Sequence, residues 1–156
     1  MAKARVIRFR VRVLKAGAPY FEVRIFPTQP AMRDWAAAHN PDKQARYADT
    51  EAAVHSWKRL VRVRGKWQWK PDMGWIVFYA GHIGAGIVSH EMTHAALYYL
   101  KLWRPQLFRV LWTSRKADEC LAWVQGFLVA QFWLKFYRAR GRRIRATGSY
   151  RRVRGI

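Results

Sequence analysis

The chain has 156 residues, 51% of them hydrophobic and 15% aromatic, which is enough to form one globular domain with a buried core. Its 30 Lys and Arg outnumber 9 Asp and Glu, and the formal net charge of +21 favours a polyanionic partner such as nucleic acid or an acidic protein, unless it serves solubility alone. The single cysteine, Cys120, excludes an internal disulfide framework and a multi-cysteine zinc ribbon, and it fits a reducing compartment.

No segment of the sequence predicts secretion or membrane insertion. The positive charge near the N-terminus is not followed by an apolar stretch, so we expect no signal peptide. The longest apolar run, residues 121–134, contains Gln125 and Gln131 and is too short to span a bilayer. We therefore expect a cytoplasmic protein.

Two alternating runs near the N-terminus predict a β-hairpin. Residues 5–14 place apolar side chains on one face and Arg8, Arg10 and Arg12 on the other. The same alternation returns in residues 21–25 after a short Gly- and Pro-containing turn, so we expect the two strands to pair. The arginine face is a candidate surface for nucleic acid.

The middle of the chain predicts a short helix and a meander. The helix would cover residues 30–38, with Thr28 as its N-cap and Pro41 beyond its end. Strands are expected at 60–63, 67–69 and 75–80, with a turn at 71–74. Residues 42–55 have a less clear pattern, and the alternatives are a continued helix or a strand that already begins at residues 53–57. Trp67 and Trp69 share one face of this ribbon, where they pack on the sheet or stack on a substrate or base.

Two long helices are predicted in the C-terminal half. The first covers residues 83–103 and ends before Pro105. The second covers residues 117–138, with Ser114 or Asp118 near its start, and is apolar nearly all round, as in a buried helix. The expected fold class is α+β, with a mostly antiparallel sheet packed against both helices in one domain, residues 1–138. Residues 139–156 form an arginine-rich tail without acidic residues, and Arg142, Arg143 and Arg145 are further candidates for contact with nucleic acid.

The first of these helices carries the motif H-E-x-x-H, as His90-Glu91-Met92-Thr93-His94. Residues four apart share a helix face, so His90 and His94 can bind one Zn²⁺ while Glu91 stands beside it as a base. The metal would lower the pKa of a water molecule, and Glu91 would take its proton as the water attacks a carbonyl carbon. Chance can also produce a motif with three fixed letters. The apolar strand and glycine turn that precede this one favour a metal site.

A hydrolytic zinc site takes three protein ligands, and the motif supplies two. After His94 the sequence has no further histidine, so a third ligand on that side is Glu119, Asp118 or Cys120. Glu119 is preferred because small residues follow it at helical spacing and would let the two helices approach closely. These residues are Ala122, Gly126 and Ala130. Alternatively, Asp118 and Glu119 only complement the positive end of the helix dipole.

Three further side chains are candidates to stabilise the oxyanion of such a reaction: Tyr98, His82 and Arg104. Tyr98 follows His94 by one helical turn, although a tyrosine at such a place is commonly a packing residue. His82 lies in the glycine turn, where a capping role is the alternative.

Residues 75–131 resemble zincin metallopeptidases that use a glutamate as third ligand. The string H-E-M-T-H, followed by Glu119-Cys120-Leu121-Ala122, is similar to the ImmA/IrrE group, some of whose members cleave repressor or regulatory proteins. His90 to Ala95 is also similar to SprT and Spartan proteases, which cut proteins crosslinked to DNA. The SprT pattern needs a third histidine downstream, which this chain lacks.

The resemblance implies a zincin-like fold, one Zn²⁺ per chain and hydrolysis of a protein substrate. The basic charge favours a substrate that is held near nucleic acid, that binds nucleic acid, or that is an acidic protein. The alternative, from charge alone, is a non-enzymatic DNA- or RNA-binding protein whose metal is structural or absent.

Overall fold

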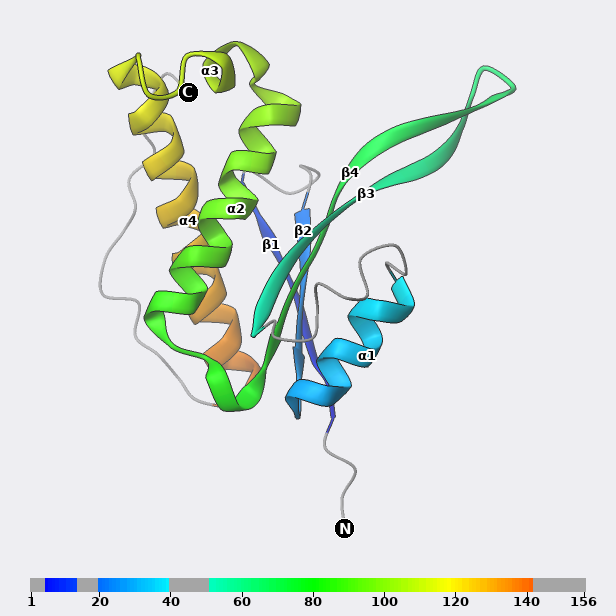
Figure 1. Cartoon of the computed structure of the whole chain (residues 1–156), viewed down its shortest axis with the longest axis vertical. Helices are drawn as coiled ribbons and strands as arrows, with labels where there is room; N and C mark the ends of the chain where they lie inside the picture. Colours follow the sequence, from blue (N-terminus) through cyan, green and yellow to red (C-terminus); the bar gives the residue numbers. More distant parts are fainter. Residues whose placement is uncertain (1–4, 14–19, 40–50, 142–156) are drawn as a thin grey trace.

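The structure, a computed structural model, describes residues 5–13, 20–39 and 51–141. The strands are β1 (Ile7–Arg12), β2 (Tyr20–Phe26), β3 (Ala52–Val63) and β4 (Lys66–Tyr79). The helices are α1 (Gln29–His39), the 3-10 turn η2 (Ala80–His82), α2 (Ala85–Trp103), α3 (Pro105–Arg109) and α4 (Arg115–Ala139). Together they form a mixed α+β fold around one 4-stranded sheet of order β1-β2-β4-β3 (Figure 1).

The sheet is mostly antiparallel, as expected, with one parallel pair at its centre. β1 and β2 form the predicted hairpin, with a register from Ile7 opposite Ile25 to Arg12 opposite Tyr20. β3 and β4 are also antiparallel. β2 runs parallel to β4, because the chain passes through α1 and β3 before β4 returns beside it.

The turn that we expected at residues 71–74 does not form, and β4 continues straight through it. Pro71 pairs with Lys58 of β3, in a part of β4 that has no other strand of the described ranges on its second side. Such an edge position tolerates a residue without an N–H donor. Gly74, with φ of 91°, supplies backbone freedom where the strand enters the main sheet.

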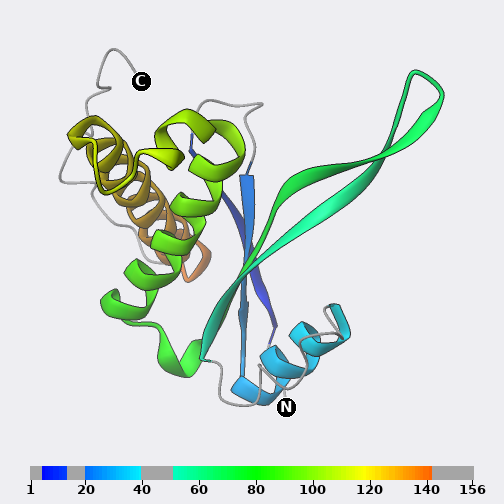
Figure 2. The same cartoon turned by 45° about the horizontal axis from the view of Figure 1, so that its top comes forward.

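α2 and α4 lie side by side on one face of the sheet (Figures 1 and 2). The core between these helices and the strands consists of apolar side chains with almost no exposed surface. Its largest fully buried members are Phe21, Ile25, Met73, Ile76, Phe78, Met92, Leu100, Leu128 and Phe132. The apolar face predicted for residues 5–14 points into this core.

α1 covers part of the opposite face and forms a smaller cluster with Phe26, Trp75 and Val77. Its predicted N-cap is confirmed, since the N–H of Ala31 donates to Oγ1 of Thr28 at 3.4 Å. The described end of the helix, His39, agrees with the prediction to within one residue.

α2 ends at Trp103, just before Pro105, as the sequence predicts, and it begins at Ala85. The expected irregular connection contains the short helix α3. α4 is buried along one stripe rather than all round, because only one of its sides faces the sheet and α2 (Figure 1). None of the helices in the described ranges is both long and apolar enough to cross a membrane.

Candidate metal centre

The two histidines of the motif converge on one point outside α2. Nε2 of His90 lies 3.1 Å from Nε2 of His94, and the ring centroids are 4.7 Å apart at an interplanar angle of 83°. Both side chains are exposed, so a solute can reach the paired nitrogens. The helical spacing of four residues, which the sequence already contains, brings them together.

This separation fits two ligands of one tetrahedral zinc ion. With Zn–N bonds of about 2.0–2.1 Å and tetrahedral angles, two ligand nitrogens lie about 3.3–3.4 Å apart. The observed 3.1 Å is close to that value. It also suits an N–H···N hydrogen bond in which one ring carries the proton. A metal ion would replace that proton with little movement of either ring.

Glu91 points from the same helix into a more enclosed environment. Its side chain is only 6% exposed, and it is the one charged residue among the buried polar side chains of the described chain. Burial raises the pKa of Glu91 above the usual value of 4.5, and the neighbouring His90 opposes that rise. A carboxyl group with a raised pKa is suited to accept a proton and to return it.

A pocket of about 540 Å³ lies beside His90 and Glu91. It is bounded by the start of β3, by η2 and by the first turns of α2. Its lining residues are Glu51, Ala52, His82, Gly84, Gly86, Ile87, His90 and Glu91. A Cβ atom added at Gly84 or Gly86 would meet nothing within 4 Å, so these glycines leave the pocket wall open rather than packed.

His82 belongs to this pocket and makes a contact that the sequence did not predict. Its Nδ1 lies 2.9 Å from Oε2 of Glu51, an ion pair when the imidazole is protonated. Ala52 pairs with Phe78 across β3 and β4, which places Glu51 beside the turn that follows β4. Sequence reasoning missed Glu51 because only this register brings it near the motif. The only local feature that could have pointed to Glu51 is its position directly before a strand.

Glu119 does not join the two histidines in this structure. Its Oε1 accepts a hydrogen bond from Nε of Arg115 at 2.9 Å, and its side chain is 65% exposed. Among residues 5–13, 20–39 and 51–141, no group of three or more His, Cys, Asp or Glu side chains is placed to hold a metal ion. The role of Glu119 as third ligand therefore stays a prediction.

Of the small residues of α4 that we expected to face α2, Ala122 is exposed, while Gly126 and Ala130 are half-buried. The polar connection between the two helices is made by Gln125. Its Nε2 donates to Oγ1 of Thr93 at 2.7 Å and to Oγ of Ser89 at 3.1 Å. This amide fixes α4 against the turn of α2 that carries the motif.

The two alternatives to Glu119 as third ligand, Asp118 and Cys120, lie in different environments. Oδ1 of Asp118 accepts a hydrogen bond from the backbone N–H of Trp112 at 3.2 Å, which ties the start of α4 to the preceding turn. Cys120 is buried in the core, and burial raises the pKa of its thiol.

The other two oxyanion candidates lie away from the pocket lining. Tyr98 packs against the core, with its ring centroid 6.5 Å from that of Phe21. Arg104 is the C-cap of α2 and lies beside Tyr99, whose pKa is raised by burial while Arg104 opposes the rise. Of the three candidates, only His82 lines the pocket.

Only some of the arginines that we predicted to contact nucleic acid lie within the described residues. Arg8 and Arg10 are exposed on the sheet face away from α2 and α4, and Arg12 is half-buried there. The guanidinium of Arg10 lies 4.3 Å from the ring centroid of Tyr20, which holds it against the sheet. Arg142, Arg143 and Arg145 fall outside the described residues.

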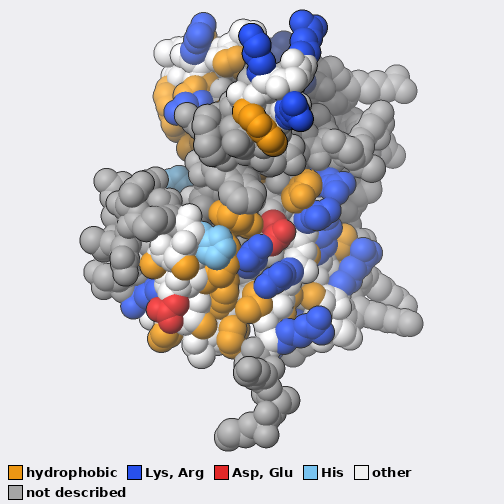
Figure 3. Space-filling view, turned by 90° about the vertical axis from the view of Figure 1, so that its right-hand side faces the viewer, with side chains coloured by type: hydrophobic (Ala, Val, Ile, Leu, Met, Phe, Trp, Pro, Cys, Tyr) orange, Lys and Arg blue, Asp and Glu red, His pale blue; other side chains and the backbone are white. Residues whose placement is uncertain are grey.

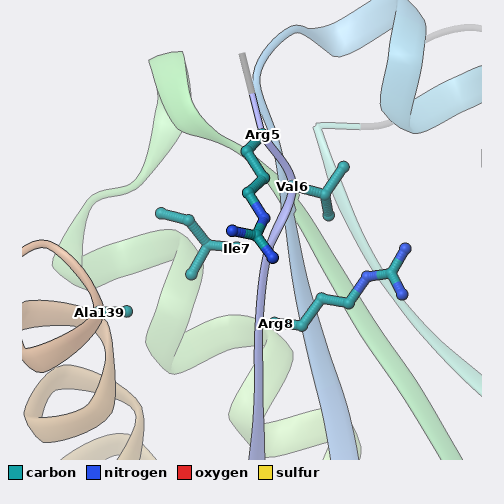
Figure 4. Close-up of a pocket in the computed structure, with 5 residues that line it drawn as sticks. All are labelled: Arg5, Val6, Ile7, Arg8 and Ala139. Carbon is teal, nitrogen blue, oxygen red and sulfur yellow. The ribbon is translucent and has the colours of Figure 1, made fainter. Parts of the chain in front are cut away.

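A second hollow, of about 710 Å³, lies at the start of β1 and the end of α4. Its lining consists of Arg5, Val6, Ile7, Arg8 and Ala139. Figure 4 shows Ile7 directed toward α4 and Arg8 on the other side of the strand. Its described lining contains no histidine or carboxylate, the groups that acid–base chemistry most often uses.

Comparison with models of protein families, with curated proteins and with solved structures finds no match to this chain.

Proposed function

We propose that the chain is a zinc-dependent metallopeptidase that hydrolyses a protein substrate. The observation that carries the proposal is the convergence of the His90 and His94 Nε2 atoms, 3.1 Å apart, next to a pocket lined by Glu91. Two imidazole donors and an adjacent buried carboxyl group are the parts that this chemistry requires.

His90 and His94 would bind the metal, one ion per chain, with Glu119 as the third protein ligand. The pair between Glu119 and Arg115 is solvent-exposed. Exposed pairs of this kind contribute about 0–1 kcal/mol, far less than a zinc–carboxylate bond, so Arg115 does not hold Glu119 back from a metal.

Zinc, when bound, would polarise the scissile carbonyl and lower the pKa of a water molecule to about 7. Glu91 takes a proton from the attacking water at a carboxylate oxygen while the water oxygen bonds to the carbonyl carbon. It then gives this proton to the amine nitrogen as the C–N bond breaks. Burial raises the pKa of Glu91, which makes the carboxylate a better proton acceptor than an exposed glutamate.

His82 is the side chain that we assign to the oxyanion, since it lines the same pocket as Glu91. Its contact with Glu51, 2.9 Å from Nδ1 to Oε2, orients the ring. The function of Glu51 would then be to position His82.

Metal stoichiometry by native mass spectrometry is the first test. The wild-type chain should carry one zinc, H90A none, and E119A none or a weakly held one. E51A and H82A serve as matched variants inside the pocket and should keep the zinc. A wild-type protein that folds without metal and takes up none would refute the proposal. Loss of zinc in E51A or H82A, with E119A unaffected, would refute the role of Glu119 alone.

Proteolysis provides the second test. Glu91→Gln preserves the shape of the side chain and removes the base, so cleavage of fluorescently labelled casein should fall by at least about 100-fold with zinc retained. Assays with and without duplex DNA would show whether a substrate associated with nucleic acid is preferred. Full activity in E91Q would remove Glu91 from the mechanism.

A second candidate function is non-enzymatic binding of nucleic acid. It is supported by the net charge of +21 and by the exposed Arg8 and Arg10 on the open sheet face. Binding of this kind should weaken steeply with salt and survive H90A. Zinc-dependent cleavage by the wild type would show that nucleic-acid binding alone does not account for the function of the protein.

A further inference from the structure

β3 and β4 extend beyond the rest of the sheet as a two-stranded ribbon. Residues 57–63 of β3 pair with residues 66–72 of β4, whereas β2 pairs with β4 only from Trp75 onward. We refer to residues 57–72 as the arm. Figures 1 and 2 show the arm projecting away from the helices and from the other strands. Its seven-residue strands span about 23 Å at about 3.3–3.4 Å per residue.

The arm is strongly basic. Between residues 57 and 70 the sequence contains no Asp or Glu, and its basic residues are Lys58, Arg59, Arg62, Arg64, Lys66 and Lys70. Near the tip, Arg62, Arg64 and Lys66 are exposed, and Trp67 is 65% exposed. In Figure 3, which views the molecule from the side on which the arm projects, more Lys and Arg than Asp and Glu side chains are visible among the residues drawn in colour.

The turn at the tip retains an arginine where the backbone disfavours one. Arg64 has φ of 49° and Gly65 has φ of 79°, the pair of positive values that a type I′ hairpin turn requires. Asn, Asp or Gly at the first position avoids much of the strain that another residue incurs in this region. Nε of Arg62 also donates to the carbonyl oxygen of Gly65 at 3.3 Å, which brings a second guanidinium to the turn. The strained conformation of Arg64 at the tip of the arm supports a functional role for its charge.

An isolated two-stranded ribbon is at best marginally stable in water. No third strand pairs with the arm among the residues that the structure describes, so a partner that contacts both of its strands would order it further. The major groove of B-DNA, about 12 Å wide and about 8.5 Å deep, admits a two-stranded β-ribbon and is bordered by phosphates. The deep, narrow major groove of double-stranded RNA does not admit one.

We propose that the arm binds double-stranded DNA, with its tip in the major groove and Arg62, Arg64 and Lys66 against the phosphates. The inference goes beyond the peptidase activity and does not depend on it. The two ends of β3 lie about 36 Å apart along an extended strand. Ala52, at one end, lines the pocket beside His90 and Glu91, and Val63, at the other end, lies at the tip of the arm. Bound DNA would therefore leave the pocket open to a protein substrate.

The test measures fluorescence anisotropy of a labelled DNA duplex of about 20 base pairs with the full chain, in salt from about 50 to about 200 mM. The arm variant R62A/R64A/K66A is compared with the control K101A/R109A/K116A, which removes the same charge from exposed positions on the helices. We expect the arm variant to bind about 100-fold more weakly and to lower the slope of log K against log salt by about 2.7. The control should change affinity less than about threefold.

The variant R64N distinguishes the effect of the Arg64 charge on DNA binding from any effect on the folding of the arm. Asn suits the turn, so the thermal unfolding temperature should stay the same or rise, while DNA affinity falls about 10-fold and the salt slope falls by about 0.9. H90A should bind DNA as the wild type does, which keeps a failure of the peptidase proposal distinct from a failure of this one.

Three results would overturn the inference. The first is equal loss of affinity in the arm and control variants, which would indicate binding to diffuse charge. The second is unchanged affinity in R64N. The third is binding of single-stranded DNA or double-stranded RNA of the same length at least as tightly as duplex DNA.

Discussion

Gln131 of α4 hydrogen-bonds to both backbone groups of Arg12 on β1. The N–H of Arg12 donates to Oε1 of Gln131 at 3.1 Å, and Nε2 of Gln131 donates to the carbonyl oxygen of Arg12. β1 is the outermost strand on this side of the sheet, so the side-chain amide takes the place of a neighbouring strand. Lys135, one turn later, donates to the carbonyl oxygen of Arg10. An edge covered in this way is protected from pairing with another chain.

Replacing Gln131 by Met should destabilise the protein and expose this edge. The substitution keeps the side-chain volume similar but leaves the N–H and C=O of Arg12 without partners, at a cost of about 1–3 kcal/mol. Urea unfolding measures the loss, and sedimentation measures any association through β1. Gln106→Met, at an exposed position of α3, is the control and should change stability by less than about 0.5 kcal/mol. Equal effects of the two substitutions would contradict the role of Gln131.

Lys135 should make stability depend on pH in alkaline solution. Burial lowers the pKa of Lys135 below its usual value of 10.5, and the charges of Arg12 and Arg138 lower it further. The unfolded chain therefore binds more protons between the lowered pKa and 10.5, so the contribution of Lys135 to folding stability rises with pH through that window. The free energy of unfolding of the wild type, relative to K135M, should increase from pH about 7 to pH about 10. Lys101→Met, at an exposed position, should show no such trend.

Zinc should stabilise the folded protein through the two histidines. At a free concentration about 100 times its dissociation constant, a ligand that binds only the folded state adds about 2.7 kcal/mol. For a domain of this size that corresponds to a rise in Tm of about 5–10 °C. H90A should lose the rise, and H39A, which removes a histidine of α1 far from the motif in sequence, should keep it. A rise of the same size in H90A would place the zinc elsewhere.

Phe132 should be among the most sensitive core positions. Its side chain is fully buried, and its ring centroid lies 5.5 Å from that of Phe9 on β1 and 5.1 Å from that of Phe78 on β4. Phe132→Ala should reduce the free energy of unfolding by about 3–5 kcal/mol, because it removes the contact of α4 with two strands at once. Phe127→Ala, at a half-buried position on the same helix, should cost less than half as much. If F132A does not fold, Phe132→Leu should show a loss of about 1–1.5 kcal/mol by the same assay.

Local periodicity allowed much of the fold to be predicted from the sequence. The alternation in residues 5–14 and 21–25 predicts which side chains face the core, and the hairpin register confirms it. The cap at Thr28 and the stop before Pro105 are equally local. The prediction of a turn at 71–74 was wrong. Proline interrupts a strand that is paired on both sides, but it is tolerated where the strand is paired on one side, as β4 is at Pro71. Which of the two applies depends on the neighbouring strands and not on the local sequence.

By itself, the sequence determined the parts of the site that depend on one helix. The four-residue spacing of His90 and His94 brings their Nε2 atoms together wherever the helix packs. Only the tertiary structure decided which other side chains lie near them. Glu51 reaches His82 because of the register between β3 and β4, and Gln125 meets Thr93 of α2 because of the rotation of α4 about its axis. Helical and strand periods act over a few residues, whereas register and helix rotation result from the packing of the whole core.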